Sequence, residues 1–326
     1  MRLFAIALSA LTLVAASLAA APSIAHTVGF QLLRISNGDD KPIVVGVWYP
    51  SDAVASDQRL DTFTQHVAPD GEVAGDHLPL VVISHGTGGW FGGHYDTAQA
   101  LARAGFVVAA LTHTGDTYND QSRSVMLWQR PPQLRRLIDY MLAEWPDHGR
   151  IDAGRVGAFG FSAGGFTVLA AAGGVADLSL VAPHCAAHPA YFECGVVKAG
   201  GGAVTLPPAS VWFRDARIKA AVVAAPALGY TFDLKAVTIP IQLWRAEDDH
   251  ILPNPDYAEA VRQHLPSPPE YHVVANADHY DFLGPCSDAL ANLAPDICAE
   301  RPGFDRTGFH AAFNADVVRF FQKQLR

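Results

Sequence analysis

The sequence predicts an α/β protein with a mostly parallel central sheet and helices on both faces of that sheet. Short apolar runs such as residues 78–83 and 106–111 alternate with longer amphipathic stretches such as 132–145. Continuous apolar runs of strand length are typical of strands that are buried on both faces. Strands that alternate with helices in this way favour parallel pairing. The chain of 326 residues is long enough for one large domain with a substantial core.

In chain order, the pattern predicts a hairpin followed by alternating strands and helices. The hairpin pairs residues 28–36 with 42–49 across the Asn-Gly-Asp-Asp turn at 37–40. A loop is expected from residue 50 to residue 75. The later strands are expected at 78–83, 106–111, 156–159, 218–224, 239–244 and 271–274, and the helices at 95–104, 132–145, from 163 and at 309–325. Because no internal repeat or linker interrupts this order, residues 26–326 are expected to form a single domain.

The first 25 residues predict a signal peptide. Arg2 supplies a positive start, residues 3–21 are mostly apolar, and Ser23-Ile24-Ala25 offers small residues at the cleavage positions. An uncleaved membrane anchor is the alternative, because the apolar run is close to spanning length. Cleavage would leave no stable membrane span. The sequence therefore predicts a periplasmic or secreted protein.

The four cysteines lie after this leader, where export permits disulfides. Four cysteines allow three pairings. The local choices are Cys185 with Cys194 and Cys286 with Cys298, since each pair brackets a loop-like stretch that a covalent bond could order. Buried free thiols are the alternative.

Charge and motifs exclude several classes of function. The net charge is −9 and basic runs are absent, which argues against nucleic acid as a partner. The sequence has no H-E-x-x-H motif and no Cys/His spacing typical of a zinc site, so we expect no metal and no cofactor.

Residues 160–164, Gly-Phe-Ser-Ala-Gly, match the G-x-S-x-G pattern of a nucleophile elbow. An apolar strand precedes the motif and an alanine-rich helix follows it, which is the setting that an elbow requires. The flanking glycines allow a strained turn and a close crossing of strand and helix. We interpret Ser162 as a nucleophile, with a simple Gly/Ser turn as the alternative.

A serine nucleophile needs a base and a third group that orients the base. His279 follows the strand at 271–274, and we predict that it is the base; His250 and His85 are the next candidates. The acids Glu247, Asp248 and Asp249 follow the strand at 239–244. Asp249 is favoured because it stands four residues before a proline, and Asp248 remains the alternative.

Two backbone N–H groups usually stabilise the oxyanion of such a reaction. One is expected from Ala163, the residue after the nucleophile. The other is expected from Thr87 in the Gly-rich run at 85–89, although this run could be only a turn. Three aromatic residues follow that run and are predicted to line either a substrate pocket or the core: Trp90, Phe91 and Tyr95.

Residues 173–214 interrupt the alternation of strands and helices. The stretch is rich in Gly, Pro, Ala and Cys and has no clear period. A stretch of that length is usually a functional loop or a small cap. Because it directly follows the helix behind Ser162, we predict a loop-rich cap or lid over the site.

A set of motifs spread over nearly all of the chain after the leader carries a family resemblance. These motifs are Val47-Trp48-Tyr49-Pro50, Ser84-His85-Gly86, the elbow with Gly165, Asp249, Asp278-His279-Tyr280-Asp281-Phe282, Gly303-Phe304-Asp305-Arg306, His310 and Phe320-Phe321. With them the chain resembles the α/β-hydrolase superfamily, and within it the branch of platelet-activating-factor acetylhydrolases and predicted dienelactone hydrolases. True dienelactone hydrolases use a cysteine nucleophile, whereas this chain has Ser162.

The resemblance implies an α/β-hydrolase fold and a serine carboxylic-ester hydrolase. Ser162, Asp249 and His279 would form its triad, and Thr87 and Ala163 its oxyanion donors. The expected substrate is a small-molecule or lipid-like ester, cleaved through an acyl-enzyme intermediate. An amidase or peptidase with the same triad is one alternative, and a non-catalytic binding protein on a hydrolase fold is another.

Overall fold

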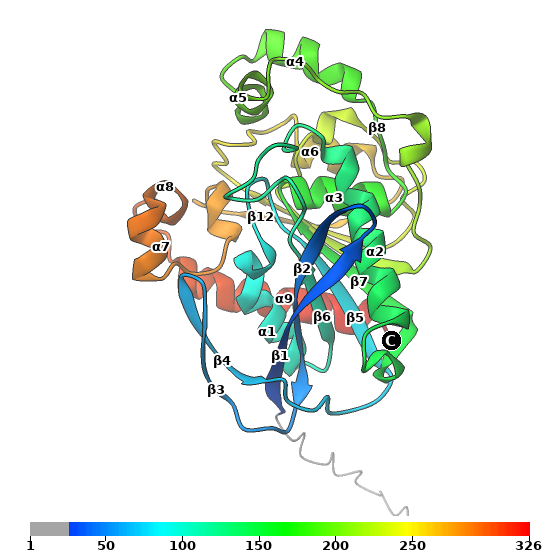
Figure 1. Cartoon of the computed structure of the whole chain (residues 1–326). Coiled ribbons are helices and arrows are strands. Elements are labelled where there is room, and N and C mark those ends of the chain that lie inside the picture. The colour runs from blue at the N-terminus through cyan, green and yellow to red at the C-terminus, as the bar shows by residue number, and fades with distance from the viewer. Residues whose placement is uncertain (1–25) are drawn as a thin grey trace, which may run out of the picture.

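The computed structural model describes residues 26–326, so the expected signal peptide lies outside the described residues (Figure 1). A ten-stranded sheet runs through the molecule in the order β12-β11-β9-β7-β5-β6-β2-β1-β4-β3. Its strands are β1 (Thr27–Asn37), β2 (Asp40–Ser51), β3 (Ser56–Leu60), β4 (Phe63–Pro69), β5 (Leu78–Ser84), β6 (Val107–Leu111), β7 (Ile151–Phe161), β9 (Ile218–Ala224), β11 (Ile241–Ala246) and β12 (Glu270–Val274).

The six strands from β12 to β6 pair in parallel and form the part of the sheet that carries the site. In the centre, Ile83 of β5 lies opposite Phe159 of β7 on one side and Ala110 of β6 on the other. The hairpin of β1 and β2 joins this part through an antiparallel pairing of β2 with β6. The mostly parallel sheet predicted from the alternating pattern is confirmed.

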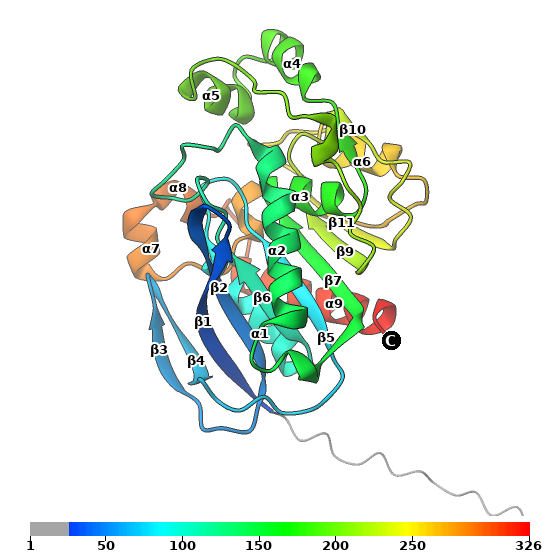
Figure 2. The same cartoon turned by 45° about the vertical axis from the view of Figure 1, so that its right-hand side comes forward.

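Helices cover both faces of the sheet (Figures 1 and 2). One face packs against α2 (Arg130–Ala143), α3 (Ala163–Ala171) and α6 (Ala258–His264), and the other against α1 (Tyr95–Arg103) and α9 (Arg306–Gln324). Two apolar cores result, one on each face, and the strand residues alternate between them: Val82 belongs to the first core and Ile83 to the second. Burial on both faces explains why these strands have continuous apolar sequences.

The predicted loop at residues 50–75 is wrong, because this region contains β3 and β4. These two strands pair with each other and extend the sheet at the edge beside β1. Their sequences are mixed and polar, so they lack the apolar run that marks the central strands. One polar side chain is nevertheless buried: Gln65 of β4 accepts a hydrogen bond from the indole of Trp48 at 2.9 Å.

The stretch at 173–214 contains short elements rather than loop alone. They are β8 (Val175–Ala176), η4 (Leu178–Leu180), α4 (Val181–Ala187), α5 (Phe192–Ala199) and η5 (Ala209–Val211). Helices of seven or eight residues complete only two turns, which is too few for a clear period in the sequence. α4 and α5 stand at the top of Figures 1 and 2, beyond the ends of the parallel strands.

Two disulfides, Cys185–Cys194 and Cys286–Cys298, are present in the structure, with the local pairing. The first joins α4 to α5. The second closes the segment that holds α7 (Asp288–Leu293) and α8 (Pro295–Cys298), two helices that the sequence pattern did not predict. Within residues 26–326, none of the helices has the length and apolar character needed to cross a membrane.

Candidate active site

Ser162 stands on a sharp turn between the end of β7 and the start of α3. Its backbone has φ 55° and ψ −119°, a conformation that is unusual for a residue with a side chain. Strand and helix approach too closely for side chains beside the turn. A Cβ atom on Gly164 would lie 1.9 Å from the carbonyl oxygen of Ser84, and one on Gly160 would lie 2.1 Å from the carbonyl oxygen of Gly164. The glycines of the motif are therefore required by packing.

Ser162, His279 and Asp249 form one chain of contacts. His279 Nε2 lies 3.1 Å from Ser162 Oγ, and His279 Nδ1 lies 2.8 Å from Asp249 Oδ2. The other carboxylate oxygen of Asp249 accepts the backbone N–H groups of Ile251 and Leu252. Because the carboxylate can only accept from His279 Nδ1, that nitrogen carries the ring proton, and Nε2 is left to accept from the serine hydroxyl.

The burial of these three side chains limits their mobility. Ser162 is 6% exposed, Asp249 8% and His279 1%. The His279 ring also packs on the ring of Phe161, at a centroid distance of 4.8 Å. The hydroxyl, imidazole and carboxylate are thus held in the order that general-base activation of a serine needs.

The rival candidates lie elsewhere. Asp248 faces Arg301 at 3.3 Å, and Glu247 accepts the backbone N–H of Asn276. The imidazole of His250 is 61% exposed and pairs with Asp278. Of the three adjacent acids, Asp249 is therefore the one that contacts His279.

Both residues predicted as oxyanion donors lie close to Ser162. Ala163 is the first residue of α3, and Thr87 lines the same pocket as Ser162. In residues 26–326, neither the N–H of Ala163 nor that of Thr87 donates to a protein acceptor. Both N–H groups are therefore available to a substrate oxygen.

His85 belongs to a buried network that supports the Gly-rich loop. Its Nε2 accepts the backbone N–H of His113 at 2.9 Å, so its Nδ1 carries the proton and donates to the carbonyl of Gly86 at 2.6 Å. The imidazole of His113 also has a partner at each nitrogen: Nδ1 lies 3.1 Å from Gln133 Oε1, and Nε2 lies 2.8 Å from the hydroxyl of Ser84. Burial and the nearby Arg130 hold the pKa values of both histidines well below their usual range, so both rings are neutral.

A buried ion pair, which the sequence reasoning missed, holds the same loop from behind. Arg130 Nη1 lies 3.5 Å from Asp116 Oδ2, and both side chains are at most 3% exposed. Arg130 donates to the carbonyl of His85, while Asp116 accepts the backbone N–H of Gly88. Burial lowers the pKa of Arg130 to about 10, and the Asp116 carboxylate partly offsets that effect. The ion pair therefore holds the loop on both sides of Thr87, at the carbonyl of His85 and at the N–H of Gly88.

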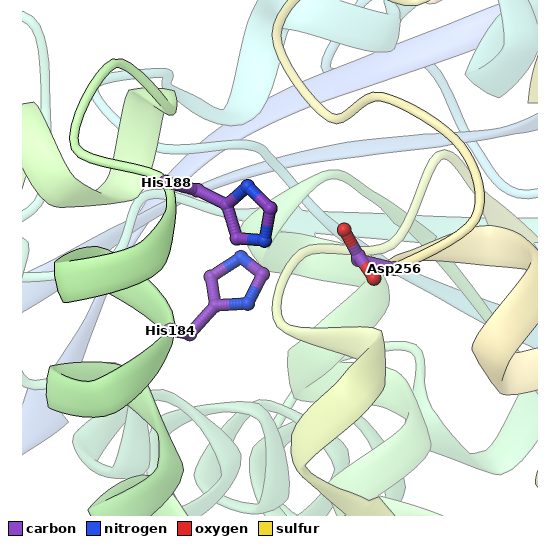
Figure 3. Close-up of side chains that lie close together, drawn as sticks. All are labelled: His184, His188 and Asp256. Atoms are coloured by element: carbon purple, nitrogen blue, oxygen red, sulfur yellow. The ribbon is translucent and has the colours of Figure 1, made fainter.

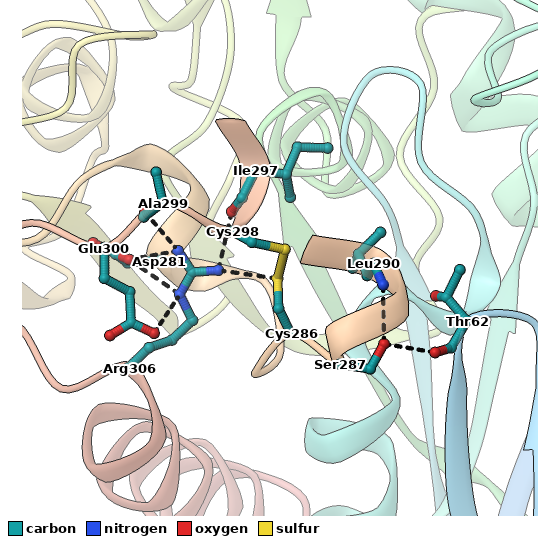
Figure 4. Close-up of a disulfide and its surroundings, with 10 residues drawn as sticks. All are labelled: Thr62, Asp281, Cys286, Ser287, Leu290, Ile297, Cys298, Ala299, Glu300 and Arg306. Atoms are coloured by element: carbon teal, nitrogen blue, oxygen red, sulfur yellow. Dashed lines mark hydrogen bonds and ion pairs between the residues drawn. A yellow bond between two sulfur atoms is a disulfide. The ribbon is translucent and has the colours of Figure 1, made fainter. Parts of the chain in front are cut away.

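A second buried ion pair joins Arg306 to Asp281, which lies close to His279 in the chain; Figure 4 shows the pair beside the Cys286–Cys298 disulfide. Asp281 lies in the same short turn, η7 (His279–Phe282), and binds Arg306 at the start of α9. Arg306 also donates to the carbonyls of Ile297 and Ala299 in the segment that the Cys286–Cys298 bond closes. No local pattern in the sequence marks this contact, because its partners are 25 residues apart.

The pocket beside Ser162 has a largely apolar lining that comes from the sheet side and from the stretch at 173–214. Its lining residues are Thr87, Ser124, Val125, Leu127, Ser162, Leu178, Val181, Phe192, Glu193, Val196, Val197, Val204, Ala227, Leu228 and Leu252. Trp90, Phe91 and Tyr95 are not among them. Phe91 is buried against Trp48, and Tyr95 stacks on Phe63 at 3.9 Å, so these aromatics pack against the β-strands near the sheet edge.

Comparison with known proteins extends this description. Residues 50–276, more than half of the chain, match the family model described as X-Pro dipeptidyl-peptidase (S15 family). The chain belongs to this family. It is a hydrolase of the α/β-hydrolase superfamily.

A solved structure also matches the fold. The ferulic acid esterase from Streptomyces cinnamoneus superimposes with a TM-score of 0.64 over 95% of this chain and 92% of the esterase chain, at 18% sequence identity. At that identity the likeness shows the fold. The α/β-hydrolase fold expected from the motifs is therefore confirmed. No protein with a curated description matches the chain.

Proposed function

We propose that this hydrolase is an exported serine carboxylic-ester hydrolase that works through an acyl-enzyme intermediate. The observation that carries the proposal is the contact chain from Ser162 Oγ through His279 to Asp249, with steps of 3.1 and 2.8 Å. Ser162, at one end of these contacts, lines a largely apolar pocket.

Each residue has a defined role in the proposed reaction. Ser162 Oγ attacks the ester carbonyl while His279 Nε2 takes the hydroxyl proton. The negative charge that develops on the carbonyl oxygen is stabilised by the N–H groups of Ala163 and Thr87, and loss of one such donor typically costs about 3 kcal/mol. His279 returns the proton to the leaving alcohol. A water molecule, activated by the same imidazole, then releases the acid, and Asp249 keeps the ring oriented throughout.

The lining of the pocket favours an ester with an apolar acyl or alcohol group. Valine and leucine side chains surround Ser162, and Phe192 adds an aromatic surface. Burial of apolar substrate surface supplies binding free energy without polar partners. A lipid-like ester fits this description, and it is the kind of substrate that the resemblance to the platelet-activating-factor acetylhydrolase branch implies.

Peptide cleavage is the second candidate function, and it is favoured by the description of the family. A dipeptidyl-peptidase must bind the free ammonium group of its substrate. Glu193 is the charged residue of the pocket lining; its Oε1 accepts the hydroxyl of Tyr257 at 2.5 Å, and its Oε2 has no hydrogen-bond partner in residues 26–326. We rank the ester above the peptide because the rest of the lining is largely apolar.

Export is proposed on the basis of the apolar leader and the disulfides. The bonds Cys185–Cys194 and Cys286–Cys298 leave no free cysteine in residues 26–326. Structural disulfides persist in oxidising compartments such as the periplasm or the exterior of the cell.

The experiment that tests the proposal combines covalent labelling with matched substrates. A fluorophosphonate should label one serine, and Ser162→Ala should abolish the label and lower kcat by about 10⁴–10⁶. Ser122→Ala, at an exposed serine, is the matched control and should label normally. p-Nitrophenyl esters of rising acyl length should be cleaved faster than anilides of the same acids.

Two results would reject the proposal in different ways. Faster turnover of an X-Pro anilide than of any ester would make the protein a peptidase. Folded protein that is neither labelled nor active would be a non-catalytic binding protein.

A further inference from the structure

Two histidines and an aspartate from distant parts of the chain converge on one another (Figure 3). His184 lies on α4, His188 directly follows that helix, and Asp256 lies in the loop before α6. One ligand atom from each of the three lies within 4.8 Å of the other two. The histidines belong to the stretch at 173–214, whereas the aspartate belongs to the loop between β11 and α6. The cluster therefore connects that stretch to the part of the protein that contains the sheet.

The donor set suits a transition-metal dication such as Zn²⁺. Imidazole nitrogen and carboxylate oxygen are common zinc ligands, at about 2.0–2.2 Å in a tetrahedral arrangement. Two such ligands are therefore about 3.3–3.4 Å apart. Glu193 Oε1 lies 3.4 Å from His184 Nε2 but already accepts the hydroxyl of Tyr257, so it is not counted as a ligand. Three protein ligands with a water molecule in the fourth position make up a common four-coordinate zinc site.

The cluster lacks another explanation for its convergence. His184 Nε2 is buried and has no hydrogen-bond partner in residues 26–326. In the same part of the chain, no lysine or arginine pairs with Asp256 or Glu193. Stacking holds the imidazoles in place, His184 on Tyr230 at 4.0 Å and His188 on Tyr191 at 4.6 Å. Asp256 and the two imidazoles thus face one another without a lysine or arginine among the described residues.

A second cluster of similar composition already contains a positively charged side chain that pairs with its carboxylates. Glu270, His272 and Asp316 also lie within 4.8 Å of one another. There, however, Arg319 forms ion pairs with both carboxylates. The ring of His272 is stacked on Trp244 at 3.9 Å. A protein cation already occupies this cluster, so it serves as an internal control.

We propose that His184, His188 and Asp256 bind one Zn²⁺ ion, which ties α4 to the loop before α6. The disulfide Cys185–Cys194 lies next to His184 and fixes α4 to α5. α5 supplies Phe192 and Val196 to the pocket lining. Zinc would therefore fix one wall of the pocket, and its binding does not depend on which substrate the enzyme cleaves.

Calorimetric titration of the chelator-treated full-length mature chain with ZnCl₂ tests the site. One zinc per chain is expected. His184→Ala and Asp256→Asn should each weaken zinc binding by more than the about 10–100-fold that loss of an outer-shell partner costs. His272→Ala should bind zinc like the unmodified protein. Because Asp256→Asn keeps the shape of the side chain, it tests the ligand role even if a histidine variant misfolds.

Two further measurements separate a built site from surface binding. Co²⁺ should give the visible absorption of a tetrahedral ion, and this absorption should be lost in Asp256→Asn. Amide hydrogen exchange of residues 181–199 should slow when zinc is added. Absence of stoichiometric zinc binding, or binding that survives both His184→Ala and Asp256→Asn in folded protein, would overturn the site. Binding without slower exchange would overturn the link between zinc and the pocket wall.

Discussion

Arg306 Nη2 lies 2.9 Å from Asp281 Oδ1, and both side chains are 1% exposed. The second oxygen of Asp281 accepts the backbone N–H of Asp278 at 2.8 Å, which closes the turn that carries His279. An arginine at the start of α9 therefore supports the imidazole that faces Ser162, without touching it. Removing one member of a buried pair leaves an uncompensated charge, which is costly.

We predict that Arg306→Met lowers the free energy of unfolding by about 3–5 kcal/mol. It should also lower kcat more than it raises KM, because the turn that holds His279 loses its support. Arg319→Met is the matched control on the same helix. Arg319 is 48% exposed, and its ion pairs should contribute at most about 1 kcal/mol. Urea unfolding and steady-state kinetics measure both effects, and equal losses in the two variants would contradict the prediction.

The adjacent acids Asp249 and Asp248 provide a sharp test of the proposed triad. Asp249→Asn should lower kcat by about 10⁴, because an amide does not hold the His279 tautomer that leaves Nε2 free to accept a proton. Asp248→Asn removes only an exposed contact with Arg301 and should leave kcat within a small factor. Ester hydrolysis by the two purified variants decides the matter. A larger loss of kcat in the Asp248 variant would show that Asp248, and not Asp249, orients His279.

Buried neutral histidines predict how stability depends on pH. Burial lowers the pKa of His94 to about 4, with Asp96 partly offsetting this effect, and it also holds the pKa values of His85 and His113 well below their usual range. Below the ordinary histidine pKa of about 6.5, the unfolded chain binds protons that the folded chain does not. The free energy of unfolding therefore has its full value above this pH. It falls between about pH 6.5 and pH 4 by about 1.4 kcal/mol per pH unit for each such histidine.

Denaturant unfolding at pH 8, 6 and 5 measures this slope. His94→Leu should reduce this slope by about 1.4 kcal/mol per pH unit, which corresponds to one proton. Neither ring nitrogen of His94 has a hydrogen-bond partner in the described residues. His66→Gln, at an exposed histidine, should leave the slope unchanged. A slope that is the same with and without His94 would show that this imidazole is not held neutral in the folded state.

The two disulfides should affect catalysis differently although their loops are similar in length. They span 9 and 12 residues, so loss of either should destabilise the fold by about 2–3 kcal/mol. Cys286→Ser/Cys298→Ser loosens the segment whose carbonyls bind Arg306, and we expect kcat to fall. Cys185→Ser/Cys194→Ser loosens one wall of the pocket, and we expect KM to rise for short acyl esters with kcat nearly kept. The opposite split would contradict this assignment.

Much of the fold could be predicted because its signals are local. The central strands are buried on both faces, so each is a continuous apolar run, and the elbow at Ser162 depends on glycines within five residues. The edge strands β3 and β4 escaped prediction because a partly solvated edge tolerates the polar sequence at 56–69. The short helices α4 to α8 escaped because each has too few turns to reveal a period.

The sequence by itself determined the α/β-hydrolase fold, the turn that presents Ser162 and the short sets of acids and histidines from which a base and its partner could come. Only the tertiary structure decided that Asp249, and not Asp248, reaches His279. It also brought together the pairs Arg306–Asp281 and Arg130–Asp116 and the cluster around His184. Strand and helix patterns arise from contacts between near neighbours in the chain. The partner of a buried charge, in contrast, is distant in the sequence and is set by the tertiary fold. The local sequence around the charge therefore does not indicate it.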